Sequence, residues 1–113
     1  MCSSDLLTDL NDTVVQLTEG IPDVMEGYMA MSSAAKADGC LDIKTKELIA
    51  TAIGVAVRCD SCIASHTKAA SMNGASREEV LEALGIAVFM GGGPSVVYAS
   101  QALTAFDEFS KDT

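Results

Sequence analysis

The chain has 113 residues, the size of one domain, and 49% of them are apolar, which is enough for a hydrophobic core. Its formal net charge of −9 argues against nucleic acid as a partner, because phosphate binding requires a basic surface. The same charge argues against docking on anionic membranes. We therefore expect one domain over residues 1–113.

The composition at the start of the chain bears on location. Four acidic and no basic residues lie in the first twenty, so the basic start of a secretory signal is missing. The longest apolar stretch, 48–57, is about half the roughly 20 residues that a membrane-spanning helix needs. We expect a soluble, cytoplasmic protein. In that reducing compartment a close cysteine pair is typical of metal binding or redox chemistry, not of structural disulfides.

Helix-forming residues are abundant and aromatic residues make up only 4%, which favours an all-α fold. No alternating strand pattern competes with this interpretation. Glycines, prolines and capping residues divide the chain into about five to six helices. These are predicted at about 4–17, 22–35, 42–57, 60–73, 77–90 and 95–109.

Three sets of residues mark the predicted helix ends. Ser3 or Ser4 is a plausible N-cap of the first helix. Ser76 with Glu79 three residues later forms a capping-box pattern for the fifth. The three glycines 91–93 lack the flanking residues of a phosphate or dinucleotide loop, so we expect them to form a tight turn between helices.

The third predicted helix indicates assembly. Its second half, 48–57, is apolar on nearly every side, and a small chain has few elements to cover such a helix. We therefore expect the subunit to oligomerise. The six methionines are expected to fill the core, as the helical spacing of Met25 and Met29 suggests.

The segment most informative about chemistry contains Cys59, Cys62 and His66, a CxxC pair followed by the only histidine of the chain. Positions four apart stack on one helix face, so His66 can reach Cys62 if a helix starts near Asp60. Cys62 would then lie in the first turn, where free N–H groups and the helix dipole lower a thiol pKa.

Charge and spacing suggest which other residues could assist the thiol chemistry. Residues 43–77 hold five basic and two acidic side chains, so the cysteines lie in the only basic part of an acidic chain. A carboxylate that orients the imidazole would complete a nucleophile, base and orienting group. Spacing alone leaves Glu47, Asp60 and Glu78 as candidates for that carboxylate.

The register of four residues resembles a known family. Glu47-x11-Cys59-x2-Cys62-x3-His66 is similar to the signature of the alkyl hydroperoxidase D-like branch of the carboxymuconolactone decarboxylase family. The segments around Lys44–Ala50, 74–76 and 90–94 resemble that family too. The similarity covers about residues 20–110, which we expect to be the core of the domain.

The resemblance implies an all-α oligomer, a homo-trimer or homo-hexamer with the site near subunit contacts. It implies an antioxidant, peroxiredoxin-like enzyme that reduces hydroperoxides or disulfides. Cys62 would be the nucleophile, Cys59 the resolving thiol, and Glu47 and His66 the proton relay. No cofactor is implied, but an external reductant is, such as a protein dithiol or lipoyl-type donor. Ser61 replaces an additional histidine of the best-studied branch, which weakens the expectation of efficient peroxidase activity.

Other interpretations stay open from the sequence. Two thiolates, His66 and Glu47 could bind zinc, although structural zinc sites usually bring a second ligand pair that this chain lacks. The cysteines could be structural, or the pair could be a non-catalytic redox sensor. A non-redox enzyme of the decarboxylase type could act through Glu47 and His66. Cys2 and Cys40 lack charged partners at telling spacing and are expected to be bystanders.

Overall fold

The computed structural model describes residues 3–111, and these form six α-helices with no strand, which confirms the all-α prediction. None of the helices in this range is long and apolar enough to cross a membrane. The helices are α1 (Ser3–Gly20), α2 (Pro22–Lys36), α3 (Ile43–Ala56), α4 (Asp60–Met72), α5 (Arg77–Gly91) and α6 (Gly93–Ser110).

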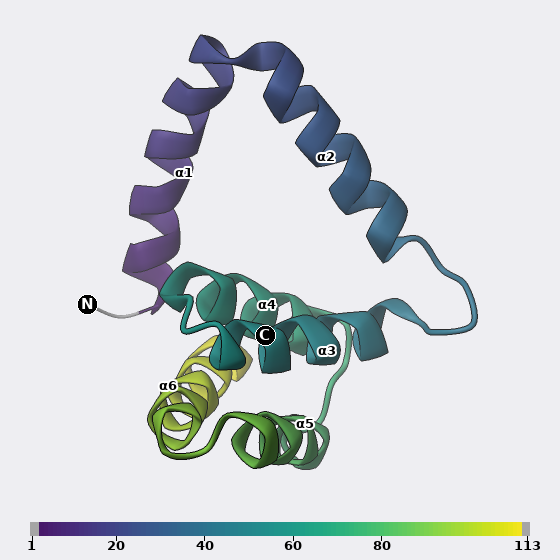
Figure 1. Ribbon diagram of the computed structural model, residues 1–113, viewed down its shortest axis with the longest axis vertical. Coiled ribbons are helices and arrows are strands. Elements are labelled where there is room, and N and C mark those ends of the chain that lie inside the picture. Colours follow the sequence, from purple (N-terminus) through teal and green to yellow (C-terminus); the bar gives the residue numbers. More distant parts are fainter. Residues whose placement is uncertain (1–2, 112–113) are drawn as a thin grey trace.

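Helices α3 to α6 pack together as a four-helix body (Figure 1). α3 contacts α4 and α5, and α6 closes the bundle against α4 and α5. The aliphatic and aromatic side chains that these helices turn inward form the core, which includes Val55, Ile63, Val80, Leu84 and Phe106. Small residues such as Ala99 and Ala102 on α6 allow close approach of the helices.

Local capping explains where the helices of the body begin. Asp42 is the N-cap of α3, and its carboxylate accepts a hydrogen bond from the Thr45 N–H at 2.8 Å. The predicted capping box of α5 is confirmed, with both Ser76–Glu79 hydrogen bonds present. The Ser76 N–H and the Lys44 ammonium, 2.9 Å away, lower the pKa of Glu79. The ion pair thereby ties the start of α5 to α3.

Two predicted helix boundaries were wrong. Ser3 and Ser4 lie inside α1, so neither is its N-cap. Of the three glycines only Gly92 lies between helices, with φ +70, and α6 begins at Gly93. Pro94 explains the early start, because its fixed φ and missing N–H suit the first turn of a helix.

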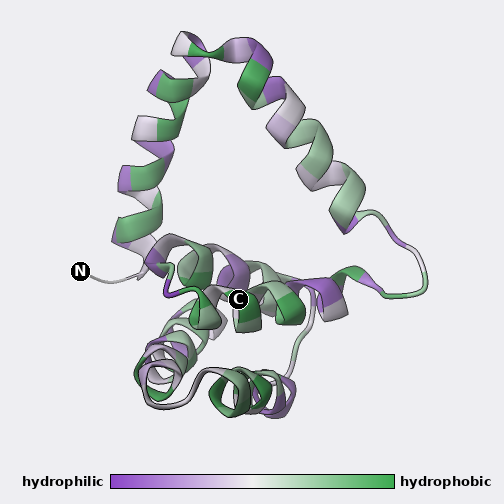
Figure 2. Cartoon of the chain, viewed as in Figure 1, coloured by the Kyte–Doolittle hydropathy of each residue, from purple (hydrophilic) through white to green (hydrophobic). Residues whose placement is uncertain are grey.

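Helices α1 and α2, here called the arm (Ser3–Lys36), stand away from the four-helix body and contain no buried residue (Figure 1). One end is held where Ser4 donates to Glu108 at 3.2 Å. The other is held by Lys46 Nζ, which donates to the carbonyls of Ala35 and Ala37 at 2.9 and 2.6 Å. Both helices carry hydrophobic residues (Figure 2).

The predicted role of the methionines was wrong within the single chain. Met29 and Met31 lie on the arm and are exposed, and Met72 and Met90 are exposed on the body. Met25 is only half-buried. The spacing of Met25 and Met29 correctly indicated a helix face, but that face has no body helix against it.

Candidate active site

The cysteine pair lies at the start of α4, and the two sulfurs are joined in a disulfide with a Cα–Cα distance of 5.2 Å. Cys59 is the N-cap of α4 in extended conformation, and its sulfur accepts a hydrogen bond from the Cys62 N–H at 3.2 Å. Both residues are half-buried. The predicted placement of Cys62 in the first turn is confirmed. Both sulfurs therefore lie at the positive end of the helix dipole.

The capping role of Cys59 was not predicted. N-cap positions favour Ser, Thr, Asp and Asn, so a cysteine is not an expected cap. The feature of the sequence that could have indicated a cap here is the abrupt end of the apolar run before Asp60. In the reduced protein the same N–H can stabilise a Cys59 thiolate.

His66 lies two turns into α4, and its Nδ1 is 2.6 Å from Oε2 of Glu47 on α3. The Glu47 side chain is 4% exposed and the His66 side chain 27%. The structure thus selects among the three carboxylates that spacing left open. Asp60 and Glu78 are exposed, and neither pairs with His66.

The contact with Glu47 fixes the roles of the two imidazole nitrogens. When Glu47 is ionised its carboxylate can only accept hydrogen bonds, and Nδ1 is then the donor of this contact. Nε2 is then left with its lone pair. Because the ring is partly exposed, Nε2 is the nitrogen that can exchange a proton with a thiol or a bound substrate.

The close approach of α3 and α4 holds the site together. A Cβ atom at Gly54 would lie 3.3 Å from the Cys62 Cβ, so glycine lets the helices meet at Cys62. On the same face of α3, the buried Thr51 hydroxyl donates to the Glu47 carbonyl at 2.8 Å. Only an unexplained glycine inside an apolar helix hinted at this contact in the sequence.

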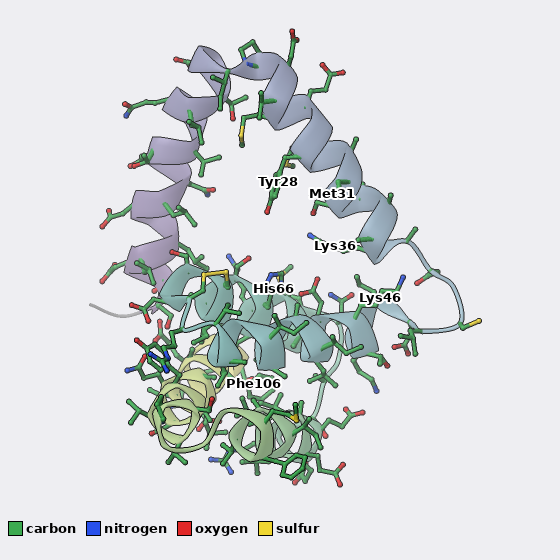
Figure 3. The ribbon with its side chains drawn as sticks, viewed as in Figure 1. Tyr28, Met31, Lys36, Lys46, His66 and Phe106 are labelled. Carbon is green, nitrogen blue, oxygen red and sulfur yellow. A yellow bond between two sulfur atoms is a disulfide. The ribbon has the colours of Figure 1, made fainter. Side chains whose placement is uncertain are left out.

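Side chains of α2 point toward the site (Figure 3), and a cavity lies beside it between α1, α4 and α6. Figure 3 shows the disulfide at one end of α4, and Tyr28 and Lys36 pointing from α2 toward the side of α4 that carries His66. On a neighbouring side of α4 is a cavity of about 590 Å³, lined by Asp60 and Ile63 and by polar residues of α6. The two cysteines do not line it.

The other two cysteines take no part in this arrangement as far as the structure describes it. Cys40 is exposed in the turn between α2 and α3 and forms no disulfide. Cys2 lies outside the described residues. Among residues 3–111, no group of three or more His, Cys, Asp or Glu side chains is arranged to hold a metal ion.

Solved structures share this fold closely. The apo form of a carboxymuconolactone decarboxylase family protein of Legionella pneumophila superposes with a TM-score of 0.94, at 46% identity over 96% of both chains. A family member of Thermotoga maritima, suggested to be involved in an antioxidative response, gives a TM-score of 0.83 at 28% identity, over 93% of this chain and 90% of its own.

Sequence relatives agree with the structural neighbours. An uncharacterised protein of Cupriavidus necator is 42% identical over 101 residues, which is 89% of each chain. A protein of Paracoccus denitrificans, described only as uncharacterised protein 4 in the cox locus, is 39% identical over 74% of this chain and 75% of its own. The model of the carboxymuconolactone decarboxylase family matches residues 22–105, which span Glu47, both paired cysteines and His66. This chain therefore belongs to the carboxymuconolactone decarboxylase family.

Proposed function

We propose that this protein is a thiol-dependent oxidoreductase that uses Cys59 and Cys62 to reduce hydroperoxides or disulfides. The observation that supports this most strongly is the contact of a partly exposed His66 with a buried Glu47, on the helix that carries the CxxC at its N-terminus. A structural disulfide would need no oriented imidazole next to it. The alkyl hydroperoxidase D-like signature and the suggested antioxidative role of the Thermotoga maritima relative point in the same direction.

In the hydroperoxide reaction, the Cys62 thiolate attacks the O–O bond and becomes a sulfenic acid. Before the attack, Nε2 of His66 takes the proton of the Cys62 thiol, and Glu47 stabilises the imidazolium that results. The leaving alkoxide takes that proton from Nε2 and departs as an alcohol, which returns His66 to its neutral form. The Cys59 thiol then condenses with the sulfenic acid, releasing water and forming the disulfide. An external thiol donor must return two electrons and two protons to start a new cycle.

In the disulfide reaction, the Cys62 thiolate attacks one sulfur of the substrate and releases the other as a thiolate. The Cys59 thiolate then attacks Cys62 in the mixed disulfide and releases the second substrate thiolate. The position of Cys59 as N-cap supports its role as the resolving group, because the Cys62 N–H stabilises negative charge on it. The donor, the substrate and the cytoplasmic location stay predictions.

The test is turnover of hydroperoxide and of a disulfide by Cys62→Ser with an excess of dithiol donor. We expect this variant to lose turnover, because serine cannot supply a thiolate. Cys40→Ser is the matched control, since Cys40 is exposed and forms no disulfide, and it should keep normal turnover.

Two other outcomes would each overturn the proposal. Unchanged turnover in Cys62→Ser would show that the reduction does not pass through the Cys62 thiolate. A disulfide that peroxide forms but no donor returns to the dithiol would favour a redox sensor.

We further propose that the protein works as a homo-oligomer, a trimer or hexamer. Folded monomers of 11.7 kDa expose roughly 5,900 Å², whereas this chain exposes 6980 Å². The difference, roughly 1,000 Å², is the area that one partner buries in an ordinary protein interface. The exposed apolar side chains that can form such an interface lie on the arm and on α5 and α6: Val24, Tyr28, Met29, Met31, Ile86, Phe89, Met90, Val96 and Val97.

A further inference from the structure

Arg58, the residue before Cys59, has a backbone conformation that arginine rarely adopts. Its φ is +60, and no other residue except glycine has a positive φ within 3–111. The cause is the way α3 ends. The Arg58 N–H donates to the Val55 carbonyl at 3.2 Å and the Cys59 N–H to the Gly54 carbonyl at 3.0 Å. This pair of bonds is the Schellman motif, whose left-handed position is usually glycine.

The strain at Arg58 has no structural compensation in the described part of the chain. A side chain in the left-handed conformation destabilises the folded chain relative to glycine. The chain does place glycine at its two other positive φ angles, Gly74 and Gly92. Arg58 is exposed, and its guanidinium has no hydrogen bond or ion pair within residues 3–111. Stability therefore gives no reason for arginine at this position.

Most of the basic segment is engaged away from the dithiol. Lys44 pairs with Glu79 and Arg77 with Asp107, while Lys46 donates to carbonyls at the end of α2. Lys68 lies 6.0 Å from the centre of the Phe109 ring. Of the five basic side chains in residues 43–77, only Arg58 is therefore left to act near the cysteines.

Arg58 is close enough to act on groups that approach the sulfurs. Its Cα is one peptide unit from that of Cys59, and Cys59 and Cys62 are 5.2 Å apart between Cα atoms. Because an arginine side chain is long and flexible, its guanidinium can come within roughly the 8–10 Å of a group at the sulfurs over which salt leaves charges unscreened. Asp60 opposes this charge from the first turn of α4, and Glu47 is already paired with His66. A guanidinium without a partner can bind a carboxylate through two parallel hydrogen bonds.

We propose that Arg58 is a specificity-determining residue that selects substrates with an anionic group close to the reactive sulfur or peroxide bond. This inference rests on the proposed thiol chemistry and adds the substrate class. The arginine binds the anionic group while the Cys62 thiolate attacks the neighbouring sulfur. One substrate thiolate leaves in that step and the second leaves when Cys59 resolves the mixed disulfide.

The test compares two disulfide reagents on the reduced full-length protein by stopped flow. Dithiobis(nitrobenzoate) is a dianion and dithiodipyridine is neutral at pH 7.5. Cys2 and Cys40 are replaced by serine in every sample, so that only the site pair reacts. Arg58→Gly removes the charge and suits the backbone, and so it should fold. Arg58→Lys keeps the charge.

We expect Arg58→Gly to slow the dianionic reagent about tenfold at low salt, and to change the rate of the neutral reagent less than twofold. Arg58→Lys should keep most of the wild-type rate with both. The tenfold ratio should shrink as salt rises, because screening weakens the attraction. Equal slowing with both reagents would overturn the proposal, as would no change with either.

These reactions consume the dithiol once and need no donor. They therefore proceed even if the protein turns over no hydroperoxide or disulfide, and their outcome is separate from that of the Cys62→Ser turnover test.

Discussion

At the scale of single residues, the proposed chemistry depends most on the Glu47–His66 contact. Its 2.6 Å length and the burial of Glu47 give the imidazole one orientation. The partly exposed ring can exchange protons, while the nearly buried carboxylate holds it. This division of roles is typical of a base and its orienting group.

The prediction at this scale concerns Glu47→Gln. The glutamine oxygen can still accept from Nδ1, but it cannot stabilise an imidazolium by charge. We expect turnover to fall about 10- to 100-fold, less than the 10²–10⁴-fold effect of a complete general base.

A second variant at Glu47 separates the loss of its negative charge from the loss of its hydrogen bond to His66. Glu47→Leu leaves the Nδ1–H without an acceptor and should also lower the free energy of unfolding, by about 1–3 kcal/mol. Denaturant unfolding measures that loss. Normal turnover in Glu47→Gln would contradict the assigned role of the carboxylate.

At the scale of elements, the distance between α3 and α4 sets the position of the nucleophile. Gly54 is the point of closest approach, because a Cβ there would be 3.3 Å from the Cys62 Cβ and 3.5 Å from the Ile63 nitrogen. The contact with the Cys62 Cβ is tight, so an added methyl group requires Cys62 to shift by a few tenths of an ångström. The helix pair is thus held close at the first turn of α4, where both cysteines lie.

Gly54→Ala tests this spacing, with Gly85→Ala as the matched control. A Cβ at Gly85 meets nothing within 4 Å, so alanine there should stabilise α5 by about 0.5–1 kcal/mol through helix propensity alone. Gly54→Ala should gain less or lose stability, and should change the rate at which oxidised glutathione forms the Cys59–Cys62 disulfide. Urea unfolding and thiol kinetics measure the two effects. An equal gain at both positions with an unchanged rate would show that the contact does not constrain the site.

At the scale of the whole molecule, the arm is the part most of whose apolar side chains are exposed within a single chain. Its 18-residue and 15-residue helices have no buried residue, and α2 makes its main contacts with α1. Helices of this length are marginal in water without an apolar face packed against something. A second copy of the chain can cover that face.

Sedimentation of the wild-type protein should therefore give a mass of three or six times 11.7 kDa. Tyr28→Glu introduces a charge at a 55% exposed aromatic on α2 and should shift the mass toward one chain. Asn11→Glu adds the same charge at an exposed polar position of α1 and should leave the assembly intact. A wild-type mass of one chain at micromolar concentration would contradict the proposed assembly.

Most of the helices could be predicted because their signals are local. The capping box at Ser76 and the stop at Gly74, with φ +86, depend only on neighbouring residues. The start of α4 after Cys59 was predicted for the same reason, and with it the position of Cys62. The errors at Ser3 and at Gly93 are shifts of one or two residues, where helix geometry tolerates several starting points.

The sequence by itself determined the class of fold and the CxxC with its histidine on one helix face, because both follow from helical periodicity. Only the tertiary structure decided that Glu47, and not Asp60 or Glu78, meets His66, since that contact spans two helices and 19 residues of chain. It also decided that the methionines of the arm are exposed and that Arg58 is strained. The exposure of the methionines depends on where α2 lies, and such long-range packing leaves no periodic pattern in the sequence. The strain at Arg58 comes from the local hydrogen bonds that end α3, at a position where the residue type, arginine, does not indicate a left-handed backbone.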